Sequence, residues 1–360
     1  MPLETGSLEP AIPPHLRVER TVPMQGKAGY RPESPSYSAR FDPRVKSLPM
    51  VYVGVQSRPD VDARATVAIL RSALAGPPGA AFYDEAVFMD EAGYANVVFV
   101  GYWDDLAAFD AWNATLPADW WHRGLASDGP IGTFRECYTP SVQDTETTFS
   151  HPYPEGYSRI AERMSGKTDT HEYWGSSRDR IPRAQTEALE PEGRPRPRTA
   201  PSDGETLGRH VEIEPHDNLC FLRSGQDWSE AEEDERDFYT GKVQPLLEKG
   251  MAEISRDGLA LGCYFNRYMT IREGGASVEK TYSISAWHSI AEIEAWVRGN
   301  THLAIWAAGI RHYTQAGDDA KLRTYHELMV LKAKDQSFSY FNCHSDTGML
   351  RSFKSVGTRG

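Results

Sequence analysis

Two histidines stand in sequence surroundings that could give them chemical roles. His302 lies in GNTHLAIWAAGIRHY, and His326 lies in LRTYHELMVL. A neutral imidazole can bind iron, and an imidazole that titrates near neutral pH can act as a general acid or base. The chain contains 11 histidines, so most of them must serve other purposes. The pattern around each histidine has to decide which of them faces a functional site.

His302 is expected at the start of a helix, where Thr301 suits the N-cap position. The apolar residues that follow recur at helical spacing, at Leu303, Trp306, Ala307 and Ile310. The positive end of a helix dipole disfavours protonation, so the imidazole would stay neutral, as an iron ligand must. A single histidine at a helix start is, however, more often structural than a ligand.

His326 is expected in a strand. Period-two alternation places one row of side chains on a single face: Leu322, Thr324, His326, Leu328 and Val330. A histidine in an otherwise apolar row must either find a buried partner or line a cavity. The pattern therefore leaves two interpretations open, a core histidine with a satisfied hydrogen bond and an acid–base group at a cavity.

Two further strings mix aromatic residues, glycine and polar side chains, as loops beside a pocket do. Arg178 and Arg180 occur in HEYWGSSRDRIP, and Ser224 occurs in HDNLCFLRSGQDW. The alternative for each string is a tight turn with solvated charges.

Two segments of the chain look like copies of one unit. The first contains a strand at 51–56, a helix at 65–74, a strand at 95–103 and a helix at 104–112. The second contains a helix that ends near 258, strands at 261–269 and 281–287, and a helix at 289–296. Each copy has two tryptophans at the same spacing, Trp103 and Trp112 in the first, Trp287 and Trp296 in the second. Each copy then ends in a further strand.

This element order, used twice, predicts an α+β fold built from a duplicated ferredoxin-like unit of the dimeric α+β-barrel type, with antiparallel sheets flanked by helices. Two such sheets packed face to face would enclose an apolar cavity large enough for a flat cofactor. The alternative is that the tryptophans match by chance in two amphipathic helices.

The domain organisation follows from composition and from these copies. Residues 1–48, rich in Pro, Ser and Arg, are expected to form an extended or disordered N-terminal arm. One domain is expected over 49–351, with halves at about 49–150 and 209–335 and a loop-rich connection at 151–208. Residues 352–360 would be a C-terminal tail.

Charge and cysteine content exclude several classes of protein. A formal net charge of −12 argues against binding to nucleic acid. The first residues, MPLETGSLEP, resemble no secretory signal, and no apolar run is long enough to span a membrane. The four cysteines are far apart in the sequence, at Cys137, Cys220, Cys263 and Cys343. Their spacing favours neither disulfides nor a zinc site, so we expect a cytoplasmic protein.

Taken together, several long strings resemble the haem-containing aldoxime dehydratases, the phenylacetaldoxime and aliphatic aldoxime dehydratase family. They are EYWGSSRDR, HDNLCFLRSGQDWSEAEEDER, LGCYFNRY, NTHLAIW, LRTYHE and FNCHSDTGMLR. The resemblance runs from about residue 51 to 351 and is strongest after residue 172. The N-terminal arm and the region 180–208 depart from the family pattern, which leaves substrate preference open.

The resemblance implies one haem b per subunit, with ferrous iron, and a homodimer. It implies that His302 is the proximal iron ligand and that His326, Ser224 and Arg178 form the distal catalytic group. The implied reaction converts an aldoxime to a nitrile and water, by coordination of the oxime nitrogen to the iron and acid-assisted cleavage of the N–O bond. Two other classes remain open here: a haem enzyme of the peroxidase or chlorite-dismutase type, and a haem-binding module without catalysis.

Overall fold

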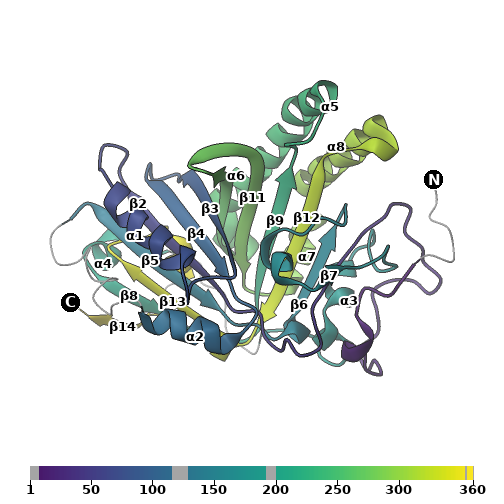
Figure 1. Cartoon of the computed structure of the whole chain (residues 1–360), viewed down its shortest axis with the longest axis horizontal. Coiled ribbons are helices and arrows are strands. Elements are labelled where there is room, and N and C mark those ends of the chain that lie inside the picture. The colour runs from purple at the N-terminus through teal and green to yellow at the C-terminus, as the bar shows by residue number, and fades with distance from the viewer. Residues whose placement is uncertain (1–7, 116–128, 192–199, 353–354, 360) are drawn as a thin grey trace.

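A curled antiparallel sheet runs through the whole protein (Figure 1). We describe it from a computed structural model, in which residues 8–115, 129–191, 200–352 and 355–359 are described. The sheet has 12 strands in the order β14-β8-β13-β5-β2-β4-β3-β10-β11-β9-β12-β6. Sequence and structure agree on an α+β fold with an antiparallel sheet flanked by helices.

The N-terminal half contributes four neighbouring strands, β5-β2-β4-β3. Its elements are β2 (Met50–Ser57), α1 (Arg64–Ala75), β3 (Phe82–Met89), β4 (Ala95–Tyr102), α2 (Leu106–Thr115) and β5 (Ile131–Tyr138). The predicted strands and helices are confirmed within a few residues. Strand β3 was not singled out by the sequence patterns.

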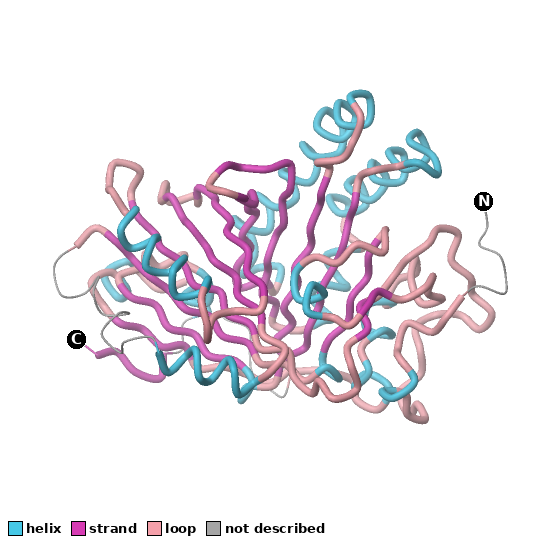
Figure 2. The backbone as a smooth tube through the Cα atoms, in the orientation of Figure 1, coloured by secondary structure: helices cyan, strands magenta, loops and turns pink. Residues whose placement is uncertain are grey.

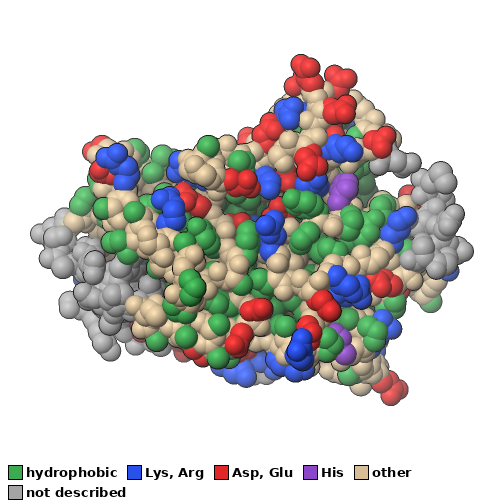
Figure 3. Space-filling model, in the orientation of Figure 1, with side chains coloured by type: hydrophobic (Ala, Val, Ile, Leu, Met, Phe, Trp, Pro, Cys, Tyr) green, Lys and Arg blue, Asp and Glu red, His purple; other side chains and the backbone are tan. Residues whose placement is uncertain are grey.

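The C-terminal half contributes the strands β10-β11-β9-β12. Its elements are β9 (Leu219–Asp227), α5 (Glu233–Phe238), a π-helical turn (Tyr239–Val243), α6 (Gln244–Leu261), β10 (Cys263–Glu273), β11 (Ala276–Trp287), α7 (Ile290–Val297), α8 (Asn300–Ala316) and β12 (Arg323–Leu331). The first turn of α5 is acidic, and Figure 3 shows acidic side chains gathered at this end of the molecule. Such a surface repels phosphate groups.

Strands β3 and β10 pair and join the two halves edge to edge in one sheet, with Ile271 opposite Ala86. Because the sheet curls, its inner faces also meet: the ring of Phe221 lies 5.3 Å from that of Tyr52 and 4.6 Å from that of Tyr138. The expectation of two separate sheets around a cofactor cavity is therefore wrong. Large buried side chains from both halves fill the space between the inner faces.

The remaining elements extend or cover this sheet. They are β1 (Ala39–Arg40), β6 (Thr145–Phe149), β7 (Arg163–Met164), α3 (Ser176–Arg180), α4 (Asp203–Thr206), β8 (His210–Ile213), β13 (Gln336–Phe341) and β14 (Ser355–Arg359). Short 3-10 turns lie at Pro14–Leu16, Val142–Asp144, Gly156–Ile160, Pro182–Gln185, Gly317–Asp319, Ala333–Asp335 and Gly348–Ser352. Helices and loops lie against the outer side of the sheet (Figure 2). Within the described residues, no helix combines the length and the hydropathy needed to cross a bilayer.

The N-terminal arm runs beside β6, β7 and α3 (Figure 1). Its described part, residues 8–48, has little regular structure, but β1 pairs with β7, and Tyr37 forms a bridge to Phe149 at the end of β6. Backbone amides of Thr21 and Val22 donate to the carbonyl of Gln185. The arm is thus extended and packed on the segment that follows β7. Residues 1–7, 192–199, 353–354 and 360, which belong to the predicted arm, connection and tail, lie outside the described residues.

We expect Gly54→Ala to destabilise the fold. A methyl group at Gly54 would overlap the ring of Phe134, which faces it across β2 and β5. Overpacking of this kind costs about 1–3 kcal/mol. The free energy of unfolding in urea measures it, with Gly76→Ala as control because Gly76 has nothing within 4 Å of the added methyl group. Equal stabilities of the two variants would contradict the packing described here.

Candidate functional site

A row of polar side chains crosses the outer face of the C-terminal half. His326 on β12 pairs directly with Ser224 on β9, and Ser224 pairs with Ser283 on β11. On the other side, Thr148 of β6 pairs with His326. Directly opposed residues of an antiparallel sheet point to the same face. Pairing thus brings together His326 and Ser224, which are far apart in the sequence.

The period-two prediction for β12 is confirmed. Leu328 and Val330, on the face of His326, belong to the outer apolar cluster under α6 and α7. Met329 and Leu331 point the other way, into the inner core. The strand therefore separates the polar row from the interior of the sheet.

The imidazole of His326 lies on the outer face of β12, within the electrostatic influence of Arg180 and His302. Its side chain is exposed to solvent. Desolvation by the surrounding protein, together with the charges of Arg180 and His302, nevertheless lowers its pKa to about 4. An exposed side chain does not fit the interpretation of His326 as a core histidine with a satisfied hydrogen bond.

His302 lies in the first turn of α8. The helix begins at Asn300, with Gly299 at the N-cap position, so the expectation that Thr301 caps the helix is wrong. Thr301 lies inside the helix and donates a hydrogen bond of 2.5 Å to Glu253 on α6. The Thr301 hydroxyl therefore links α8 to α6 and does not cap the N-terminus of α8.

The His302 imidazole favours its neutral form mainly because it is buried, a cause other than the expected helix dipole. Burial lowers its pKa, and the backbone of Val297 opposes part of the effect. The Nδ1 atom is buried without a direct hydrogen-bond partner among the described residues. The ring packs edge-on against Trp296, with centroids 5.0 Å apart. Trp296, found through the tryptophan spacing, thus orients His302.

The apolar stripe predicted for α8 is largely uncovered. The helix packs on its neighbours through Ile305, which lies over Gly250 of α6, and through Ala308 and His312. Trp306 and Ile310, in contrast, are 56% and 48% exposed. A helix face with His302 at one end and exposed apolar side chains along it suits contact with a large flat apolar ligand.

These features fit a haem. Three features of this region suit a haem with one protein ligand. They are a neutral imidazole on α8, an apolar helix face beside it and a second imidazole near enough to interact with the first. In the part of the chain that the structure describes, no group of three or more His, Cys, Asp or Glu side chains could hold a metal ion. A single histidine ligand therefore agrees better with the residues present than a metal site built from side chains alone.

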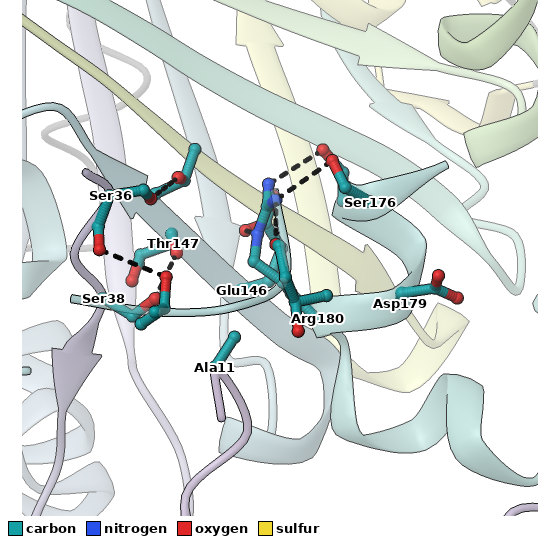
Figure 4. A network of polar contacts seen from close by, with 12 residues as sticks. Ala11, Ser36, Ser38, Glu146, Thr147, Ser176, Asp179 and Arg180 are labelled. Carbon is teal, nitrogen blue, oxygen red and sulfur yellow. Dashed lines mark hydrogen bonds and ion pairs between the residues drawn. The ribbon is translucent and has the colours of Figure 1, made fainter. Parts of the chain in front are cut away.

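Arg178 and Arg180 occupy different surroundings although both belong to α3. Arg178 forms a two-pronged ion pair with Glu294 of α7, at 2.9 and 3.1 Å, and donates to the carbonyl of Ala188. Arg180 forms a two-pronged ion pair with Glu146 of β6, at 2.7 and 3.1 Å. Figure 4 shows this second pair beside Ser176. No contact among the described residues brings Arg178 to His326, whereas the charge of Arg180 acts on that imidazole.

Sequence reasoning thus missed two residues beside the site, Arg180 as a partner of His326 and Glu146 as its counter-ion. The RDR spacing offered a signal, because residues two apart on a helix point to nearly opposite sides. It could not tell which arginine faces the sheet. Strand β6, which carries Glu146, was not predicted at all. Ser224 lies where the prediction needed it, half-buried and next to His326.

We expect His326 to titrate near pH 4 in the haem-free protein. Since the unfolded chain binds this proton more readily, stability should fall as the pH drops from about 6.5 towards 4. Arg180→Gln removes a nearby positive charge and should raise the pKa of His326, whereas Arg178→Gln should leave it unchanged. Nitrogen-15 NMR of the imidazoles, with His326 assigned through His326→Gln, measures both. A larger effect of Arg178→Gln would reverse the assignment of the two arginines.

Comparisons with known proteins identify the family of this chain. A family model described as haem-containing dehydratase matches residues 51–349. The aliphatic aldoxime dehydratase of Rhodococcus erythropolis is 36% identical over 353 residues, which cover 96% of this chain and 98% of that protein. The phenylacetaldoxime dehydratase of Bacillus sp. (strain OxB-1) is 29% identical over 331 residues, covering 90% and 93%.

Solved structures give the same result. A crystal structure of aldoxime dehydratase matches with a TM-score of 0.89 at 34% identity, covering 97% of this chain and 100% of that one. A crystal structure of an aldoxime dehydratase in complex with butyraldoxime matches with a TM-score of 0.87 at 34% identity, covering 96% of each chain. The protein described here therefore belongs to the family of haem-containing dehydratases.

Proposed function

We propose that this protein is a haem-dependent aldoxime dehydratase, a lyase that converts an aldoxime to a nitrile and water. The observation that carries the proposal is the direct pairing of His326 with Ser224 on the outer face of the sheet, with His302 near enough to act on the charge of His326. An acid–base group, a hydroxyl group and an iron ligand are the parts that aldoxime dehydration on haem requires. The relatives named above supply the substrate class.

His302 would hold the haem iron, and the bound haem supplies a coordination site for the oxime nitrogen and electron density for N–O cleavage. The chain's own residues manage the protons. Ser224, next to His326 across the strand pair, orients the oxime hydroxyl by a hydrogen bond. His326 donates a proton to that hydroxyl oxygen, so that water leaves, and then takes the proton from the oxime carbon. His326 gives one proton to the leaving hydroxyl and takes one from the oxime carbon, so its protonation state is restored at the end of the reaction.

Arg180 and Glu146 tune this transfer. A positive guanidinium group disfavours protonation of His326 and makes the imidazolium a stronger acid. The Glu146 carboxylate offsets much of that charge, since both side chains are almost fully buried and form two hydrogen bonds to each other. We propose that Arg180 takes the role towards His326 that the resemblance gave to Arg178. Arg178 then holds α3 against α7 through Glu294.

We also propose that the fold is a duplicated ferredoxin-like unit. In both halves, the first strand in chain order lies between the last and the third, and the second strand lies beyond the third. The order is β5-β2-β4-β3 in the N-terminal half and, read from the opposite end, β12-β9-β11-β10 in the C-terminal half. Gly54 lies under the ring of Phe134 in one half, and Gly225 lies under the ring of Tyr325 in the other. Each pair joins the first and last strands of its half. A glycine beneath an aromatic ring at matching positions supports a common origin of the halves.

We further propose a single domain over 49–351 preceded by an arm, a homodimer and a cytoplasmic location. Sedimentation of the purified protein measures the oligomeric state. The contacts of the arm with residues 163–186 support treating arm and domain as one folding unit.

The test of function is a visible spectrum recorded without oxygen, before and after reduction, followed by addition of phenylacetaldoxime or butyraldoxime. We expect a Soret band that shifts when the aldoxime binds, and nitrile formed by the reduced protein. Haem uptake with peroxide turnover but no nitrile would favour a peroxidase-like enzyme. Haem uptake with neither reaction would favour a non-catalytic haem-binding module.

Two histidine variants separate cofactor binding from proton transfer. His326→Ala should lower kcat by roughly 10²–10⁴ and retain haem, because a positioned acid–base group contributes about that much. His302→Ala should lose or misplace the haem. The Soret absorbance per protein and the rate of nitrile formation measure the two effects. Nearly full activity of His326→Ala would exclude its proposed role.

A further inference from the structure

We infer that Asp179 is a positioning residue: its carboxylate ties the N-terminal arm to α3 and thereby holds Arg180 beside His326. The inference rests on the proposed function, because it concerns the same site. It gives the arm, which the sequence patterns left without a role, a part in the reaction.

Asp179 does not pair with the arginines on either side of it. Its side chain is buried, and its carboxylate accepts hydrogen bonds from the backbone amides of Gln25 (2.8 Å) and Gly26 (3.1 Å) and from the hydroxyl of Tyr173 (2.8 Å). Figure 4 shows the Asp179 side chain directed away from the Arg180–Glu146 pair. The carboxylate therefore belongs to the arm side of α3, and Arg180 belongs to the sheet side.

Helix α3 needs such external support. It has only five residues, Ser176–Arg180, and an isolated turn of helix is unstable in water. Its N-cap residue, Gly175, has a left-handed φ of 91° and lies so close to Gln25 that a side chain there would overlap that residue. Contacts with the rest of the protein, not the helix itself, must therefore fix the direction of Arg180.

The arm supplies that contact over a short stretch. Arg20 donates to the carbonyl of Asp179 at 2.7 Å, so the arm binds both the backbone and the side chain of this residue. Gly26 lies against the ring of Tyr173, with no room for a side chain. Hydrogen bonds to a buried carboxylate are about twice as strong as neutral ones. Loss of the carboxylate would leave these buried donors unpaired and free α3 to shift.

Glu172 provides a matched control. Its carboxylate also binds the arm, by accepting the backbone amides of Glu33 (2.6 Å) and Ser34 (3.1 Å). It lies outside α3 and, in the described part of the chain, forms no hydrogen bond or ion pair with Arg178 or Arg180. Glu172→Gln should therefore weaken the docking of the arm without changing the position of Arg180.

The experiment compares Asp179→Ala, Asp179→Asn and Glu172→Gln as purified holoenzymes. Haem content, thermal midpoint, kcat and KM for butyraldoxime are measured for each. We expect Asp179→Ala to lower kcat by about 10- to 100-fold with haem retained, because a small displacement of a catalytic group costs about that much. Asp179→Asn keeps an acceptor oxygen and should restore most of the activity. Glu172→Gln should lower the thermal midpoint while kcat stays near that of the wild type.

A double variant tests the route of the effect. If Asp179 acts through Arg180, then Asp179→Ala should cost little further activity in an Arg180→Gln background. Additive losses, equal losses for Asp179→Ala and Glu172→Gln, or wild-type kcat in Asp179→Ala would each overturn the inference. These outcomes leave the proposed function standing, since the wild type must form nitrile for any of them to be measured. A wild type that forms no nitrile would instead remove the proposed function and the inference together.

Discussion

The register between β9 and β12 is the constraint on which the site depends. Side chains alternate across a strand, so a slip of one residue would exchange the two faces. On the outer face, this register places His326 opposite Ser224; on the inner face, it places Glu327 opposite Arg223. Arg223 forms an ion pair with Asp84 of β3, and the Glu327 carboxylate accepts the backbone amide of Ser158. Moving Arg223 to the other face would leave its charge unpaired, at a cost of several kcal/mol. The buried Arg223–Asp84 ion pair therefore fixes the positions of His326 and Ser224 without contacting them.

The inner face also has an electrostatic character of its own. Burial raises the pKa of Glu327 to about 8, although the charge of Arg223 opposes the shift. A protonated Glu327 beside Arg223 leaves the positive charge to be met by Asp84 and by the tyrosine rings around it. The backbone of β12 separates this group from His326. Desolvation thus shifts the pKa values of His326 and Glu327 in opposite directions, because the charged form of histidine is protonated and that of glutamate is deprotonated.

The sequence allowed the framework to be predicted better than the surroundings of the site. Period-two and helical spacing predict β12, α7 and α8, since these patterns depend on residues close together in the chain. The role of Thr301 and the choice between Arg178 and Arg180 depend on contacts with Glu253, Glu294 and Glu146, which come from distant segments. The place of the apolar ligand was wrongly assigned to the space between two sheets, because the pattern of a strand does not show how far the sheet will curl. Composition indicated an arm, but only its contacts show that it packs on α3.

The two tryptophan pairs pack differently in the described parts of the two halves. In the N-terminal half, Trp103 and Trp112 pack 4.8 Å apart, and the indole of Trp112 donates to the carbonyl of Ala73 in α1. Valines of β2 fill the outer face there, so its helices pack directly on the sheet. In the C-terminal half, Trp287 and Trp296 form the matching pair, at 6.1 Å, but Trp296 contacts the ring of His302. The polar row on β9, β11 and β12 then replaces the valines, and α8 keeps apolar side chains exposed. One topology thus gives a packed outer face in the N-terminal half and, in the C-terminal half, a polar row beside a helix with exposed apolar side chains.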